Sequence, residues 1–255
     1  MKTWTFFLLA TLSCAHTSTE QKPAPSVSFG QSIDFPSLDY IMGKFDPAKH
    51  PDFMLIPTSY ADREGLYLRK DVFEAYKKMH AAAKAAEVKL VIISATRPFN
   101  YQKGIWEAKW NGSRLVEGKD LSKTIADPKL RALKILEYSS MPGTSRHHWG
   151  TDFDLNDLEN AYFTSGEGAK VYQWLAANAA EYGFCQVYSP KGAERPHGYN
   201  EEKWHWSYLP VAKQLSDFAA ANLKDELIAG FQGAETAQGI GVVEKYVLGI
   251  NPACR

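Results

Sequence analysis

The stretch Ser145-Arg146-His147-His148-Trp149-Gly150-Thr151-Asp152-Phe153-Asp154-Leu155 contains two histidines and two carboxylates within a few residues. Glycine at position 150 suits a turn that leads into a strand. From Thr151 onward the side chains of such a strand alternate, so Asp152 and Asp154 share one face while Phe153 and Leu155 share the other. The apolar face can then pack against a core, and the acidic face can look into a site.

A second cluster, Glu201-Glu202-Lys203-Trp204-His205-Trp206, places a histidine three residues after an acid. Zinc hydrolases use three protein ligands and leave a fourth position to water. They also need a carboxylate that takes a proton from this water and passes it to the leaving amine. The two clusters together offer a His, Asp, His ligand set, and Glu202 is placed to act as the base.

Around these clusters, capping and periodicity signals predict three helices and two short strands. Asp71 and Glu74 begin a segment with an apolar face at helical spacing, and Asp127-Pro128 is typical of a helix start. The predicted helices cover residues 71–86, 127–138 and 168–182, and the predicted strands cover 89–94 and 184–188. Strict alternation of strands and helices is missing, which favours an α+β fold over a doubly wound sheet.

The composition argues against some functions. The 255 residues have a formal net charge of zero, so no basic surface predicts binding to the phosphates of nucleic acid. The sequence has no Gly-x-Ser-x-Gly pattern, which would be typical of a serine hydrolase. The sequence gives no indication of an oligomeric state.

The N-terminus predicts export. Residues 1–14 combine a lysine, a short apolar run and small residues, as a secretory signal does. Ser13 before Cys14 resembles the cleavage box of bacterial lipoproteins, in which a lipidated cysteine anchors the chain to a membrane; a plain signal cleaved near Ala15 is the alternative. Residues 15–28 are predicted to form a disordered tether, and residues 29–255 a single domain. The expected location is the periplasm, the outer membrane or the cell surface.

Two cysteines, Cys185 and Cys254, remain beyond the predicted signal. In an oxidising compartment they could form a disulfide. Sequence alone does not show whether their backbones come close enough, so free buried thiols are the alternative.

The two clusters match the motifs of a known family. The first follows Ser-x-His-x-x-Gly-x-x-x-Asp, and the second follows Glu-x-x-His with an aromatic residue after it. Together they resemble the zinc D-alanyl-D-alanine carboxypeptidases and dipeptidases, whose fold is shared with lysostaphin-type peptidases and the hedgehog signalling domain. The resemblance implies an antiparallel sheet flanked by helices, with Zn²⁺ bound by His147, Asp154 and His205 and with Glu202 as the catalytic base.

A third segment, from Ser94 to Gln102, resembles the family segment in which an arginine and, five residues later, a glutamine face the substrate. The resemblance implies that Arg97 stabilises the oxyanion and that Gln102 and Ser145 bind the peptide or its terminal carboxylate. The chain departs from the family at two places, with Asp152 at a position that is often small and Thr96-Arg97-Pro98 in place of Tyr-Arg-Ser. Asp152 could bind a substrate ammonium group or act as an alternative metal ligand.

The resemblance and the export signal together predict a zinc peptidase that releases D-alanine from the stem peptides of peptidoglycan. The same site could serve a D,D-dipeptidase, an L,D-carboxypeptidase or an endopeptidase. A non-catalytic, zinc-stabilised cell-wall binding domain is an alternative of a different class. Glu202 and Arg97 argue against it, because a structural zinc site needs neither a base nor an oxyanion donor.

Overall fold

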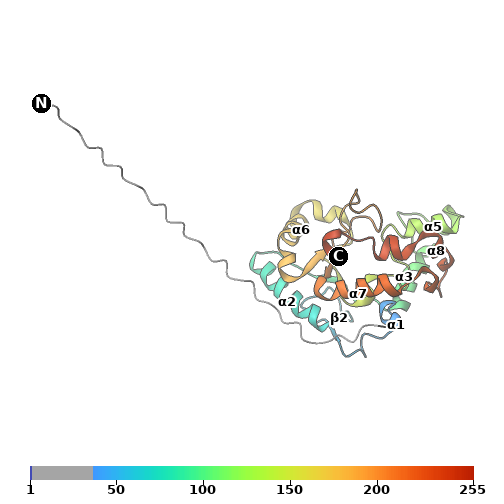
Figure 1. Cartoon of the computed structure of the whole chain (residues 1–255), viewed down its shortest axis with the longest axis horizontal. Coiled ribbons are helices and arrows are strands. Elements are labelled where there is room, and N and C mark those ends of the chain that lie inside the picture. Colours follow the sequence, from blue (N-terminus) through green and yellow to red (C-terminus); the bar gives the residue numbers. More distant parts are fainter. Residues whose placement is uncertain (2–36) are drawn as a thin grey trace. The chain divides into compact units, whose positions relative to one another are not determined.

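The computed structural model describes residue 1 and residues 37–255, and in this part of the chain it contains α-helices and six strands (Figure 1). In chain order they are α1 (Leu38–Ile41), β1 (Phe53–Leu55), β2 (Tyr67–Arg69), α2 (Lys70–Ala85), β3 (Ile92–Ser94), α3 (Phe99–Trp110), α4 (Leu121–Thr124), α5 (Pro128–Ile135), β4 (Asp152–Leu155), α6 (Gly166–Asn178), β5 (Phe184–Gln186), β6 (His205–Tyr208), α7 (Leu209–Asn222) and α8 (Ala237–Ile240). Short 3-10 turns connect several of them, including Arg146–Trp149 directly before β4.

The predictions for the N-terminus fall outside the described residues. Apart from residue 1, the expected signal of residues 1–14 with Cys14, the tether of residues 15–28 and the start of the domain at residue 29 all lie there. From residue 37 onward the described chain belongs to one compact unit, Phe35–Arg255. No helix in this part of the chain has the length and apolar character needed to cross a membrane.

The central element is a four-stranded antiparallel sheet with the strand order β3-β4-β6-β5. The alternation expected from the sequence holds in β4, where Phe153 and Leu155 belong to a hydrophobic core. In the neighbouring strand β6, His205 is the register partner of Asp154, and Ser207 is the partner of Asp152. Because register partners in a sheet point to the same face, one face is apolar and the other carries polar side chains.

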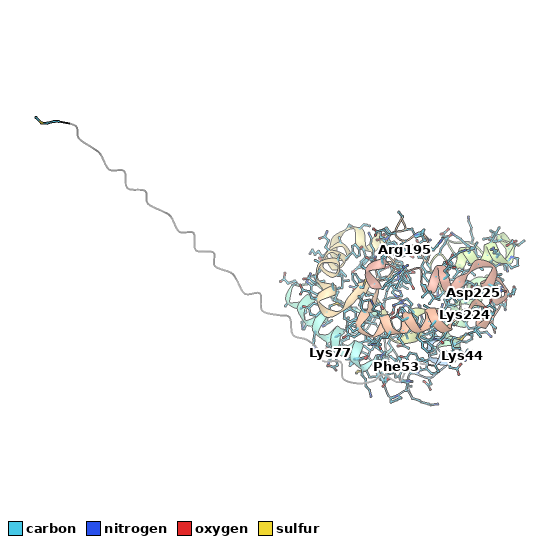
Figure 2. All side chains as sticks on the ribbon, in the orientation of Figure 1. Lys44, Phe53, Lys77, Arg195, Lys224 and Asp225 are labelled. Carbon is cyan, nitrogen blue, oxygen red and sulfur yellow. A yellow bond between two sulfur atoms is a disulfide. The ribbon has the colours of Figure 1, made fainter. Side chains whose placement is uncertain are left out.

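Two hydrophobic cores hold this sheet. The core on the apolar face unites α2, α6 and the strands through residues such as Tyr76, Leu175 and Phe153. The other core unites α1, α3, α5, α7 and the C-terminal segment, with Trp106 and Trp149 among its buried members. In Figure 1, α2 and α6 lie at one end of this unit and α3, α5 and α8 at the other. Side chains fill the space between these elements (Figure 2). Tyr188 of this second core packs against His205 with ring centroids 4.7 Å apart, so the second core borders the polar face of the sheet.

The predicted elements agree with the structure in kind and differ in length. Helix α2 matches the prediction over 71–86, and Asp127 caps α5 by accepting a hydrogen bond from the Leu130 amide. The predicted strand over 89–94 is shorter, because the side chain of Asn156 bonds the Val91 amide and the Lys89 carbonyl in place of a ladder. Helix α5 ends at Ile135, before the predicted end at residue 138.

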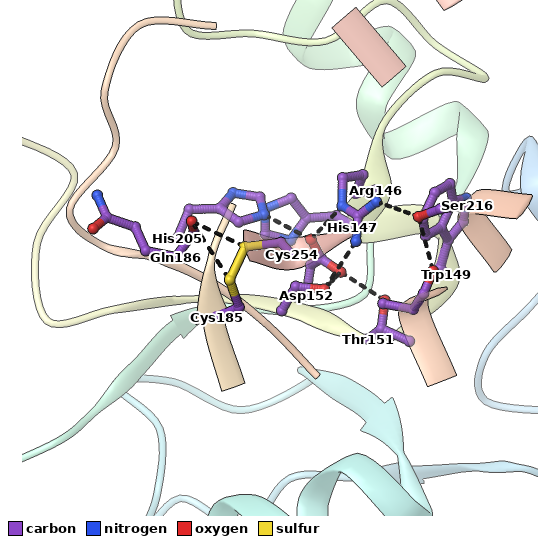
Figure 3. A network of polar contacts seen from close by, with 12 residues as sticks. Arg146, His147, Trp149, Thr151, Asp152, Cys185, Gln186, His205, Ser216 and Cys254 are labelled. Atoms are coloured by element: carbon purple, nitrogen blue, oxygen red, sulfur yellow. Dashed lines mark hydrogen bonds and ion pairs between the residues drawn. A yellow bond between two sulfur atoms is a disulfide. The ribbon is translucent and has the colours of Figure 1, made fainter. Parts of the chain in front are cut away.

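The open question about the cysteines is answered by the structure. Cys185 on β5 and Cys254 near the C-terminus form a disulfide, with a Cα–Cα distance of 5.8 Å. Figure 3 shows this bond close to Gln186, whose carbonyl lies beside the Cys254 sulfur. The disulfide ties the edge strand of the sheet to the end of the chain.

Candidate metal centre

Three side chains converge on the polar face of the sheet. His147 comes from the 3-10 turn before β4, Asp154 from β4 and His205 from the first position of β6. One ligand atom from each lies within 4.8 Å of the other two. The carboxylate oxygen Oδ1 of Asp154 is 3.4 Å from His147 Nε2 and 3.4 Å from His205 Nδ1.

The turn that presents His147 depends on Gly150. This residue has φ +72°, and a Cβ atom there would come within 2.3 Å of the Phe53 ring. Phe53, labelled in Figure 2, belongs to the core that includes Trp149. Glycine therefore permits both the left-handed backbone and the close packing that brings the turn into strand β4.

Hydrogen bonds fix which nitrogen of each histidine faces the cluster. His147 Nδ1 lies 2.9 Å from the Ala95 carbonyl, which can only accept, so Nδ1 carries the proton. His205 Nε2 lies 2.9 Å from Asp152 Oδ2 and likewise donates (Figure 3). His147 Nε2 and His205 Nδ1 therefore have their lone pairs available beside Asp154. This is the arrangement in which an outer carboxylate or carbonyl orients a metal-binding imidazole.

The donor set fits a zinc ion. His147 Nε2 and Asp154 Oδ1 are both buried and have no hydrogen-bond partner among the described residues. Buried polar atoms are rarely left unsatisfied, and an ion is one cause of such a pair. Two imidazole nitrogens and a carboxylate oxygen are ligands that zinc accepts, and three protein ligands leave a position for water.

The electrostatics keep Asp154 charged and make Glu202 a better proton acceptor. Burial disfavours the charge of Asp154, but His147, His205 and Arg97 outweigh it and lower the pKa of this carboxyl to about 2. Burial raises the pKa of Glu202, which is only 5% exposed, against the opposing effect of His205. A raised pKa brings a carboxylate closer to the range of an effective general base at neutral pH.

Glu202 and Arg97 both lie at the metal cluster. Glu202 Oε2 is 3.3 Å from His205 Nδ1. Arg97 follows β3, and its amide donates to the His147 carbonyl at 3.1 Å, which joins the two segments. Its Nε is buried without a hydrogen-bond partner among the described residues, so this group has capacity for a further acceptor. The structure thus brings together all five residues expected to carry the chemistry.

Asp152 occupies a different place from the expected one. It is fully buried and accepts hydrogen bonds from Arg146 at 3.0 Å, Thr151 at 2.6 Å and Ser207 at 2.7 Å, besides the bond with His205. Burial opposes its charge, but Arg146 and His205 hold its pKa far below the usual range. Both carboxylate oxygens of Asp152 accept hydrogen bonds from protein groups. Asp152 is therefore not placed to bind a substrate ammonium group or to act as a metal ligand. It is the partner that orients His205.

Gln102 and Ser145 also lie deeper than expected. Gln102 is 1% exposed and donates from Nε2 to the Ser140 carbonyl at 2.8 Å, while its Oε1 has no partner within the described chain. Ser145 is 1% exposed, and its hydroxyl likewise has no partner in the part of the chain that the structure describes. Neither residue lines the pocket described next, so a direct contact with substrate stays a prediction.

A pocket of about 960 Å³ opens onto the cluster. His147, Asp154, Glu202 and Arg97 are among the residues that line it. Trp204 and Tyr138 also line it, with ring centroids 6.4 Å apart. A pocket of this volume is within the range of small-molecule and peptide sites.

Sequence reasoning missed Arg146. Its guanidinium lies over the Trp149 ring at 4.4 Å and bonds Asp152, Ser207 and Ser216 (Figure 3). The signal that could have found it is charge, because a carboxylate buried at Asp152 needs a cation nearby. Arg146 is the cation closest to it in the same cluster of the sequence.

Comparison with known proteins supports the same fold. The chain is 27% identical over 188 residues to the "Putative carboxypeptidase YodJ" of Bacillus subtilis (strain 168), which covers 69% of this chain and 59% of that protein. It is 30% identical over 84 residues, 28% of this chain and 63% of the other, to an uncharacterized protein of Haemophilus influenzae. The chain thus spans about six tenths of the length of these curated relatives.

Among solved structures, the LdcB LD-carboxypeptidase has a TM-score of 0.50 at 23% identity, with 80% of this chain and 81% of that chain covered. This likeness confirms the α+β fold with an antiparallel sheet flanked by helices. The family model VanY, described as D-alanyl-D-alanine carboxypeptidase, matches residues 65–211, which include the whole cluster. Since this match covers more than half of the chain, the protein belongs to the VanY family of D-alanyl-D-alanine carboxypeptidases.

Proposed function

We propose that the protein is a zinc-dependent D-alanyl-D-alanine carboxypeptidase that acts on the stem peptides of peptidoglycan. The observation that carries this proposal is the buried His147, Asp154, His205 cluster with Glu202 in contact with it. A structural zinc site would need no such carboxylate, so the geometry favours catalysis over a non-catalytic binding domain.

The roles of the residues follow from their positions. His147, Asp154 and His205 would hold the ion, which would lower the pKa of a water molecule and polarise the peptide carbonyl. Glu202 accepts a proton from the attacking water and delivers it to the nitrogen of the departing residue. Arg97 donates hydrogen bonds to the oxygen on which negative charge develops. The C–N bond breaks, and the products are a shortened peptide acid and free D-alanine.

Product analysis tests this proposal. The protein is incubated with defined pentapeptide and tetrapeptide muropeptides, with a chelator and after restoration of zinc, and the products are identified by mass spectrometry. We expect terminal D-alanine to be released from the pentapeptide, lost with the chelator and recovered with zinc. Release from the tetrapeptide alone would indicate an L,D-carboxypeptidase, loss of a dipeptide a dipeptidase, and internal cleavage an endopeptidase.

A pair of adjacent glutamates supplies the matched control. Glu202→Gln should lose hydrolysis by several orders of magnitude while it still binds zinc. Glu201→Gln removes the same charge one residue earlier, outside the pocket lining, and should retain activity. Full activity of Glu202→Gln would contradict the assigned mechanism. Zinc binding and binding of cell-wall fragments by the unmodified protein without any cleavage would favour the binding-domain alternative.

We also propose that the protein is exported and that Cys14 carries its anchor. The support is the sequence of residues 1–14. Detergent phase partitioning of the native protein and of Cys14→Ala separates the alternatives: a lipoprotein moves to the aqueous phase after the substitution, whereas a protein with a plainly cleaved signal is aqueous in both forms.

A further inference from the structure

Helix α3 presents two different faces. Gln102, Trp106 and Trp110 recur every four residues and are buried. Tyr101, Ile105 and Lys109 recur with the same spacing and line the pocket. At a rise of about 1.5 Å per residue, this second face runs for about 12 Å from Tyr101 to Lys109. Because Arg97 lies just before the helix, α3 leads from the metal cluster along the pocket to a lysine.

Three cations that line the pocket have no acidic partner among the described residues. Arg97, Lys109 and Arg114 all line it, and none of them forms an ion pair with a carboxylate among the described residues. The pocket is also lined by carboxylates: Asp62 pairs with Arg63, Glu117 pairs with Lys134, Asp154 and Glu202 belong to the metal cluster, and Asp157 and Glu159 lie in the loop after β4. Three cations without a paired carboxylate in one pocket leave charge that an anionic group could balance.

Lys109 is held in place rather than free in solvent. Its Nζ donates a hydrogen bond to the Ser139 hydroxyl at 2.5 Å, and Ser139 is itself buried and lines the pocket. Burial, Arg114 and Arg97 lower the pKa of Lys109 to about 8, while Glu202 raises it. The ammonium is therefore still predominantly charged at neutral pH, although its neighbours are cations. A bound anion would relieve this repulsion.

We propose that Lys109, with Arg114 beside it, binds the C-terminal carboxylate of the peptide substrate. The inference rests on the proposed function for the direction in which the peptide lies. With the scissile carbonyl at the metal cluster, the D-alanine to be released would lie on the side of the pocket that Arg97, Lys109 and Arg114 line. Arg97 and Lys109 line the same pocket, so the lysine would select chains whose terminal carboxylate lies beside it.

Recognition by Lys109 would also explain the deep positions of two other side chains. Gln102 donates its amide to the Ser140 carbonyl, and neither it nor Ser145 lines the pocket. A full ammonium charge is a stronger partner for a carboxylate than a neutral amide or hydroxyl. An endopeptidase has no terminal carboxylate to bind at this place, so the cations favour an exopeptidase.

Binding to a variant that cannot turn over tests the inference. The zinc-loaded Glu202→Gln protein is titrated calorimetrically with diacetyl-L-lysyl-D-alanyl-D-alanine and with its C-terminal amide. We expect the acid to bind more tightly than the amide. Adding Lys109→Met should weaken binding of the acid about 10- to 100-fold, as expected for a lost charge-assisted hydrogen bond, and leave the amide unchanged. Lys109→Arg should retain part of the preference.

The matched control is Lys103→Met, which removes a lysine from the same helix outside the pocket, where Nζ bonds the Gly230 carbonyl. It should not change the preference for the acid. The inference would be overturned if the acid and the amide bind equally well while Lys109 is intact, a comparison that needs no variant of Lys109. It would also be overturned if Lys109→Met binds the acid as tightly as the protein with Lys109. Cleavage by the unmodified protein is measured separately: Lys109-dependent binding of the acid without cleavage would overturn the proposed function and leave this inference standing.

Discussion

Replacing Asp152 by asparagine separates two effects that one buried carboxylate has on this protein. Asp152 forms a fully buried ion pair with Arg146 and holds the Nε2 side of His205. The amide keeps the size of the side chain but not its charge. Arg146 then lacks its ionic partner in an environment where neither side chain touches solvent. Breaking a buried pair from one side costs about 3–5 kcal/mol, and we expect the free energy of unfolding to fall by about that amount.

The same change should weaken zinc binding. An asparagine offers His205 a neutral acceptor, which fixes the ring less firmly and makes its Nδ1 less basic. Loss of such an outer partner lowers metal affinity about 10- to 100-fold. The zinc dissociation constant is measured by competition with a chromophoric chelator, and stability by urea denaturation of the metal-free protein. Asp217→Asn, an exposed carboxylate on α7, is the control for both measurements.

A double variant distinguishes the two causes. In Arg146→Met with Asp152→Leu the unpaired charge is gone, so stability should recover toward that of the unmodified protein. Zinc affinity should stay low, because His205 still lacks its carboxylate. An Asp152→Asn protein that binds zinc as tightly as the unmodified one would refute the orienting role. Recovery of zinc affinity in the double variant would refute it as well.

Three further outcomes are expected. Gly150→Ala should destabilise the fold by about 1–3 kcal/mol in urea denaturation, because the backbone is left-handed there and the new Cβ would meet Phe53. Removing the disulfide with Cys185→Ser and Cys254→Ser should cost about 4 kcal/mol, as expected for a cross-link between residues 69 apart, and reducing agent should then have no further effect. Since the pKa of Lys109 is lowered to about 8, its charge is present below that pH and lost above it, so calorimetric affinity for a peptide acid should fall above about pH 8 and remain in Lys109→Arg.

The elements with strong local signals could be predicted from the sequence. Asp127 with Pro128 marks the start of α5, and the alternation in Asp152–Leu155 gives the polar face of β4. Both depend on interactions between residues close in sequence. Asp154 and His205 are register partners although they are 51 residues apart in the sequence. Local sequence patterns do not predict this contact, and only the resemblance to a family suggested it. The sequence could not decide whether Cys185 and Cys254 form a disulfide for the same reason, because they are 69 residues apart.

The environment of charged groups was the part that could not be predicted. Asp152 was expected to face the substrate or the metal. The structure confirms that it shares a face of β4 with Asp154, but its partners there are Arg146 and His205. Whether a carboxylate on that face meets solvent or a cation depends on the 3-10 turn that carries Arg146. This turn is only four residues long, so no repeating hydrophobic pattern in the sequence predicts it. Lys109 was missed because lysine side chains ordinarily lie in solvent, whereas this one donates a hydrogen bond to Ser139 beside the pocket.

The register of β4 against β6 has a consequence for how the chain folds. Asp154 meets His205 only in the observed pairing, and a slip of one residue would turn the aspartate toward the apolar core. A slipped sheet would therefore lose the third donor along with its packing. In the proposed zinc enzyme, the ion would bind with full affinity only to chains whose strands have paired correctly. By mass action it would therefore favour the native register over a slipped one.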